Sequence, residues 1–141
     1  MGLAMAQQLL RPGHALVCIS RHRNPDLADM ATRASATLEQ WEQDLSHGEQ
    51  AAHTLRSWLT AQGPTAFASA TLINNAGVIP RIAPLSASDP ADLAHALRVG
   101  LEAPMQLTAA FLGATDTWAV PRKVLNISSG LGRRAMASQA A

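Results

Sequence analysis

Short apolar segments that end in small polar residues are the feature that most constrains the fold of this chain. They are "HALVCIS" at 14–20, "ATLINNAG" at 70–77 and "KVLNISS" at 123–129. Each is short, almost continuously apolar and rich in Val, Ile or Leu, which is typical of strands covered on both faces. Helical periodicity separates them, over 48–62 and 90–113. This alternation predicts βαβ units and a Rossmann-type, doubly wound parallel sheet in an α/β fold.

The rest of the chain fits the same scheme. Apolar residues recur at helical spacing in "MGLAMAQQLL", before "RPGH" breaks the pattern, so an amphipathic helix is expected at the start. We further expect a helix over 26–38, a weaker strand in "LEQWEQDLS" and a loop in "IPRIAPLSASDP". Because no repeat or linker interrupts the chain, the sequence predicts a single domain over residues 1–141.

Composition narrows the functional class. Hydrophobic residues make up 48% of the chain and charged residues 15%, with a net charge of +1, so we expect a globular protein without a nucleic-acid partner. No apolar stretch approaches the ~18–20 residues that cross a bilayer, so we expect no membrane partner. Cys18 is the single cysteine, which excludes an internal disulfide and indicates a cytoplasmic, reducing compartment. The histidines lack metal-ligand spacing, and no metal site is expected.

The residues that follow the predicted strands indicate where a ligand would bind. Ligands of open α/β sheets sit beyond the carboxyl ends of the strands, and here "SRHR", "NNAG" and "SSG" occupy those places. Ser20 and Arg21 follow the first strand with no carboxylate before Asp26. An arginine at this place accommodates the 2′-phosphate of NADP(H), whereas an acidic residue would favour NAD(H). The alternative interpretation is a solvated basic loop.

The other two strand ends carry small polar residues. Asn75, Ala76 and Gly77 would let a ligand approach the backbone closely, although an ordinary Asn-Gly-type turn is the alternative. Ser129 could donate a hydrogen bond to a substrate carbonyl and stabilise charge that develops there. Strand alternation would point Ser128 to the opposite face. The flanks of these serines lack the G-x-S-x-G elbow, which disfavours a hydrolase.

Taken in order, "MG", "SR", "DLS", "NNAG" and "NISSGLG" resemble the short-chain dehydrogenase/reductase family over the whole of 1–141. The "SSGLGRR" loop is similar to its sepiapterin and benzil reductase branch. The resemblance implies that Gly2 closes the pyrophosphate loop, Arg21 lies at the 2′-phosphate and Ser129 is the catalytic serine. It also implies that the pair Asp44 and Leu45 borders the adenine, and that Asn75, Ala76 and Gly77 line the cofactor.

Family members transfer a hydride between NAD(P)H and a small carbonyl or alcohol, using a Y-x-x-x-K pair that follows the serine. The chain contains no tyrosine, and the family's tyrosine would fall at the first position after Ala141. The family's first strand and glycine loop would likewise precede Met1. We therefore expect a fragment, cut at both ends and inactive by itself, of an NADP(H)-dependent enzyme. The alternative is a non-catalytic nucleotide-binding module of the same fold.

Three further expectations follow from the resemblance. Gly100 stands where the family usually has an asparagine associated with a break in the long helix and with a proton-relay water. The 90–113 helix is expected to form the contact of a homodimer or homotetramer. With the family's central strand absent, the slot between the strands at 14–20 and 70–77 would have no occupant.

Overall fold

The computed structural model describes residues 1–134 and 136, and it divides into two compact units, Met1–Leu45 and Ser46–Ala141. Unit 1 contains α1 (Gly2–Leu9), β1 (Ala15–Ser20), α2 (Pro25–Ala34) and β2 (Thr37–Glu42). Unit 2 contains α3 (Gly48–Gln62), β3 (Ala70–Asn74), α4 (Pro90–Leu97), α5 (Ala103–Ala114) and β4 (Arg122–Asn126). The α/β class with parallel strands is confirmed, whereas a single domain over 1–141 stays a prediction.

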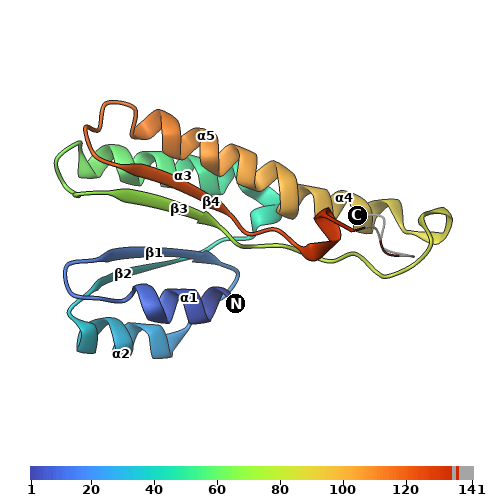
Figure 1. Ribbon diagram of the computed structural model, residues 1–141, viewed down its shortest axis with the longest axis horizontal. Helices are drawn as coiled ribbons and strands as arrows, with labels where there is room; N and C mark the ends of the chain where they lie inside the picture. The colour runs from blue at the N-terminus through green and yellow to red at the C-terminus, as the bar shows by residue number, and fades with distance from the viewer. Residues whose placement is uncertain (135, 137–141) are drawn as a thin grey trace. The chain divides into compact units, whose positions relative to one another are not determined.

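In unit 1, strands β1 and β2 pair in parallel, with Ala15 opposite Thr37 and Ser20 opposite Glu42. Helices α1 and α2 both lie on one face of this pair (Figure 1). Alternation along the strands turns Leu16, Cys18 and Leu38 toward that face. There they pack against a buried cluster of helix and turn residues, which comprises Ala6, Leu10, Leu27 and Ala31.

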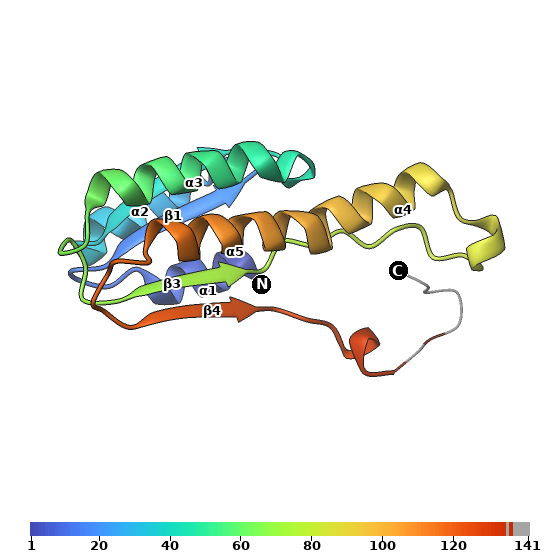
Figure 2. The same cartoon turned by 90° about the horizontal axis from the view of Figure 1, so that it is seen from above.

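In unit 2, strands β3 and β4 pair in parallel, with Asn74 opposite Asn126. Helices α3 and α5 cover one face of the pair, and α4 extends beyond the carboxyl ends of the strands (Figures 1 and 2). The buried residues between the two helices include Ala51, Leu55, Ala103 and Leu107. At Gly48 the two helices lie close together, because a Cβ added there would lie 2.8 Å from the Cα of Ala103.

The strands form two separate two-stranded sheets, β1–β2 and β3–β4, within the residues that the structure describes. The pairing of β1 with β2 and of β3 with β4 agrees with the strand order of a doubly wound sheet. The unfilled slot expected between β1 and β3 stays a prediction. No helix in the described ranges is long and apolar enough to cross a membrane.

The element boundaries correct the sequence reading in two places. The expected helix over 26–38 ends at Ala34, because Ser35 takes the left-handed conformation (φ 52°) and Thr37 begins β2. The N-cap is Asn24, whose side chain accepts from the Asp26 N–H. Strand β4 ends at Asn126, so the strand alternation expected of Ser128 and Ser129 does not apply.

The expected 90–113 helix contains a π-helical turn over Arg98–Glu102, between α4 and α5. In this turn the Ala103 N–H donates to the carbonyl of Arg98, five residues back. Pro104 supplies the physical reason, because it has no N–H for the Gly100 carbonyl and its ring would crowd that oxygen in an α-helix. A break near Gly100 was expected, and the structure shows one.

Candidate active site

The candidate residues of unit 1 gather at the carboxyl ends of β1 and β2. Ser20 closes β1, and Arg21 follows it. Asp44 and Leu45 follow Glu42, the last residue of β2. Because β1 and β2 are parallel and Ser20 lies opposite Glu42, both strands end at the same edge of the sheet. The beginning of α1, where Gly2 lies, is at this end of β1 as well (Figure 1). Unit 1 thus places five of the predicted site residues at one end of its strand pair.

The loop after β1, residues 21–24, is held by contacts within the chain. The Ser20 hydroxyl donates to the carbonyl of His22 (2.7 Å). Arg23 is paired through its Nε with Oε2 of Glu42 at 3.4 Å. The Arg21 guanidinium is exposed and makes no hydrogen bond or ion pair with the part of the chain that the structure describes. Of the two arginines that begin this loop, Arg21 is therefore the one free to meet an anion.

Gln40 fixes the far end of this loop, a role that sequence reasoning missed. Its Oε1 accepts from the Asn24 N–H (2.7 Å), and its Nε2 donates to the Asn24 carbonyl (2.9 Å). The side chain of Gln40 thus pairs with the Asn24 backbone as a neighbouring strand would. A glutamine in a strand carries no sequence signal for such a role, because its partner lies sixteen residues away.

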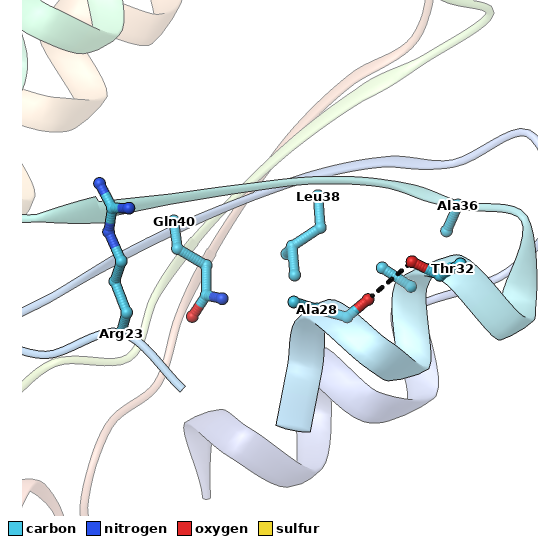
Figure 3. Close-up of a pocket in the computed structure, with 7 residues that line it drawn as sticks. Arg23, Ala28, Thr32, Ala36, Leu38 and Gln40 are labelled. Atoms are coloured by element: carbon cyan, nitrogen blue, oxygen red, sulfur yellow. Dashed lines mark hydrogen bonds between the residues drawn. The ribbon is translucent and has the colours of Figure 1, made fainter. Parts of the chain in front are cut away.

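A hollow of about 350 Å³ lies between α2 and β2, and its lining includes Ala28, Thr32 and Leu38 (Figure 3). Arg23 and Gln40 stand at one side of it. The Thr32 hydroxyl is occupied by its bond to the Ala28 carbonyl. The hollow follows the helix flank, and none of the predicted site residues lines it.

In unit 2, a buried asparagine joins the ends of β3 and β4. The Asn74 side chain is 8% exposed. Its Nδ2 donates to Oδ1 of Asn126 (2.8 Å) and to the hydroxyl of Thr108 on α5 (3.2 Å). The Ile127 N–H donates to the Asn74 carbonyl (2.9 Å). This clamp fixes where the segments that carry Asn75 and Ser129 leave the sheet.

Asn75, Ala76 and Gly77 follow directly after β3. Asn75 is half-buried, and its Oδ1 is buried without a hydrogen-bond partner in the described structure. An acceptor that is buried without a donor costs free energy, so a donor that reached this oxygen would be stabilised. Ala76 and Gly77 are exposed, and a Cβ at Gly77 would meet nothing within 4 Å.

Ser129 follows β4 at the start of a 3₁₀ turn over Gly130–Gly132. Its hydroxyl oxygen accepts from the Leu131 N–H (3.2 Å), and the residue is exposed. Since an acceptor lone pair is used, the hydroxyl proton stays available for a substrate oxygen. Ser128 is different: its Oγ lies 3.3 Å from a Cβ that would be added to Gly132, against the same turn.

The predicted site therefore divides between the units. Gly2, Ser20, Arg21, Asp44 and Leu45 belong to unit 1, and their shared position is the end of β1–β2. Asn75, Ala76, Gly77 and Ser129 belong to unit 2, at the end of β3–β4. Unit 1 offers the unpaired guanidinium of Arg21. Unit 2 offers the Asn75 amide oxygen without a donor and the Ser129 hydroxyl, which accepts from the Leu131 N–H.

Comparisons of sequence place these features among known proteins. A family model described as short chain dehydrogenase matches residues 1–141. The chain is 29% identical over 133 residues to the benzil reductase ((S)-benzoin forming) of Bacillus cereus, covering 94% of this chain and 53% of that protein. It is 27% identical to the benzil reductase of Bacillus subtilis (strain 168), covering 94% and 52%. The chain spans about half the length of these relatives.

Solved structures agree with this assignment. A short-chain dehydrogenase/reductase from Burkholderia vietnamiensis is 35% identical with a TM-score of 0.85, over 99% of this chain and 63% of that one. A metagenomic short-chain oxidoreductase in complex with NADP is 30% identical with a TM-score of 0.83, over 97% and 60%. Since the family match extends over all 141 residues, the chain belongs to the short chain dehydrogenase family.

Proposed function

We propose that this chain carries the NADP(H)-binding side and the catalytic serine of a reductase that transfers a hydride between NADP(H) and a carbonyl or alcohol. The observation that carries the proposal is the arrangement at the carboxyl ends of the paired strands β3 and β4. Asn75 follows β3 directly, and Ser129 lies three residues after the end of β4. The Asn75 Oδ1 accepts no hydrogen bond in the described structure, and the Ser129 hydroxyl, which accepts one from Leu131, can still donate its proton.

The residues present suit such a cofactor. Arg21 would hold the 2′-phosphate, beside Ser20, because a guanidinium binds phosphate in a charge-assisted, bidentate manner. Gly2 would allow close approach of the pyrophosphate, and Asp44 with Leu45 would border the adenine. The orphaned acceptor of Asn75, with Ala76 and Gly77 open beside it, would meet the nicotinamide side. The cofactor, when bound, supplies the hydride.

Ser129 would act on the substrate carbonyl. Its hydroxyl would donate to the carbonyl oxygen and stabilise the negative charge that develops as the hydride arrives. The 141 residues contain no tyrosine, so a tyrosine within them cannot return the proton to that oxygen. We therefore propose that these residues alone do not turn over a substrate. Aryl ketones of the benzil type are the first substrates to test, since the relatives are benzil reductases.

The test is the loss of NADPH absorbance with benzil, measured on the natural gene product. We expect Ser129→Ala to lower kcat by about two orders of magnitude with an unchanged Kd for NADPH. Ser128→Ala is the matched control and should reduce kcat much less, because its side chain lies against the 130–132 turn. Equal effects of the two substitutions would contradict the role given to Ser129.

A second candidate, a non-catalytic nucleotide-binding module, is favoured by one observation, the absence of tyrosine. The same assay separates the two. A gene product that binds NADP(H) but reduces no carbonyl, with Ser129→Ala indistinguishable from wild type, would establish the module.

We also propose self-association through the 90–113 region. Leu97, Leu101 and Met105 are 55%, 55% and 64% exposed at intervals of four residues. A twofold axis at Leu101 would place Leu97 of one copy against Met105 of its partner, which makes the surface self-complementary. Leu101→Lys should therefore give monomers in sedimentation analysis, whereas Leu85→Lys, 62% exposed but outside the helix, should not. An unchanged mass for Leu101→Lys would exclude this interface.

The single cysteine accords with a cytoplasmic, reducing compartment.

A further inference from the structure

Two arginines follow β1, but they differ in their surroundings. Arg21 is free of partners in the described structure, whereas the Nε of Arg23 lies 3.4 Å from Oε2 of Glu42. Both partners of this ion pair are accessible, at 67% and 54% exposure of the side chains. A phosphate monoester that approached this strand end could therefore compete for Arg23.

The position of Glu42 is fixed by the sheet. It is the last residue of β2 and lies opposite Ser20 in the parallel register. Arg23 is held nearby, because Gln40 binds both backbone groups of the next residue, Asn24 (Figure 3 shows Arg23 beside Gln40). The loop therefore cannot carry Arg23 far from Glu42 without breaking these two hydrogen bonds.

We propose that Glu42 sets the strength of phosphate binding at the end of β1, by occupying Arg23 and by repelling the anion. This inference rests on the proposed binding of the 2′-phosphate at Arg21. With Glu42 in place, the strand end offers one free guanidinium, and the second is released only when phosphate displaces the carboxylate. Glu42 thereby lowers the preference for NADP(H) over NAD(H) below the value that two free arginines would give.

The expected effect is moderate, because the ion pair is exposed and solvent screens it. Glu42→Gln keeps the size of the side chain and removes its charge. We expect it to tighten binding of a 2′-phosphorylated ligand about three- to tenfold. Two effects add up to this gain: Arg23 no longer has to break its ion pair with Glu42, and the carboxylate no longer repels the phosphate. A ligand without the phosphate should bind as before. Arg23→Gln together with Glu42→Gln should give a smaller gain, since only the repulsion is then relieved.

The experiment titrates 2′-AMP into the ¹⁵N-labelled natural gene product and follows the Nε–Hε resonances of Arg21 and Arg23, assigned with Arg21→Lys and Arg23→Lys. Adenosine is the phosphate-free probe. Asp29→Asn is the control, because it removes the same charge from an exposed site on α2. Backbone amide spectra verify that each variant keeps the fold. A lower Kd for 2′-AMP in Glu42→Gln, with no change in Asp29→Asn, supports the inference.

Two results would count against it, and they are distinguishable. If 2′-AMP shifts Arg21 but binds Glu42→Gln and wild type equally, or if Asp29→Asn gains as much, the role of Glu42 is wrong and the phosphate site stands. If 2′-AMP shifts neither arginine in any variant, the strand end binds no phosphate, and the proposed cofactor preference fails together with the inference.

Discussion

Replacing Asn74 by alanine tests whether the ends of β3 and β4 are clamped as the structure indicates. The substitution removes an Nδ2 group that donates to Asn126 at 2.8 Å and to Thr108 at 3.2 Å. A net intramolecular hydrogen bond contributes about 0.5–1.5 kcal/mol, so two give about 1–3 kcal/mol of lost unfolding free energy. Asn126 is exposed and can turn to water. We therefore expect Asn126→Ala alone to cost less than Asn74→Ala.

Two measurements check this. Urea unfolding followed by tryptophan fluorescence gives the change in unfolding free energy for Asn74→Ala, Asn126→Ala and the double variant. Amide hydrogen exchange gives the local effect, because the Ile127 N–H donates to the Asn74 carbonyl at 2.9 Å. We expect faster exchange at Ile127 and no change at Trp118, whose N–H donates to Thr115 within the same unit.

The outcome also decides whether the clamp acts as a pair. If it does, the double variant should be less destabilised than the sum of the single variants. An Asn74→Ala protein within about 0.5 kcal/mol of wild type, a value usual for surface positions away from such features, would refute the clamp. So would unchanged protection of the Ile127 amide.

Other predictions follow from single positions. Gly48→Ala should lower the unfolding free energy by about 1–3 kcal/mol, because its Cβ would lie 2.8 Å from the backbone of Ala103. Gly100→Ala, with nothing within 4 Å, should instead be neutral or stabilising by up to about 1 kcal/mol in the same urea experiment. Arg21→Asp should weaken NADP(H) binding by the gene product about ten- to a hundredfold and leave NAD(H) binding unchanged or improved, measured by fluorescence titration. Burial raises the pKa of the Cys18 thiol. Because the folded state holds the thiol proton more tightly than the unfolded state does, the Cys18 thiol stabilises the fold fully below the ordinary thiol pKa. This stabilisation is lost as the pH rises from the ordinary pKa through the raised pKa of the folded state. Unfolding free energy should thus fall less above about pH 8.5 in Cys18→Ala than in wild type.

The sequence alone determined the order and type of most elements. The α3 boundaries at 48 and 62 agree with the periodicity, since a helix whose buried side recurs every three or four residues is a local pattern. The strands β1, β3 and β4 lie where the apolar runs predicted them, and they pair in parallel as the α/β pattern predicted. The candidate site residues were also named from the sequence, because in parallel α/β sheets ligands bind beyond the carboxyl ends of the strands. Their roles stay predictions, and β4, expected to be covered on both faces, is exposed at every position in the structure.

Tertiary structure decided what depends on partners distant in the sequence. The helix expected over 26–38 stops at Ala34, because residues 37–42 gain more by pairing with β1 than by extending the helix. Gln40, Asn74 and Glu42 look like ordinary strand residues, and only their contacts with Asn24, Thr108 and Arg23 give them roles. Propensity and periodicity describe a residue's near neighbours, whereas a hydrogen bond or ion pair across strands is set by register and packing. For that reason the sequence could name candidate residues at the strand ends, but it could not show the residues that hold those strand ends in place.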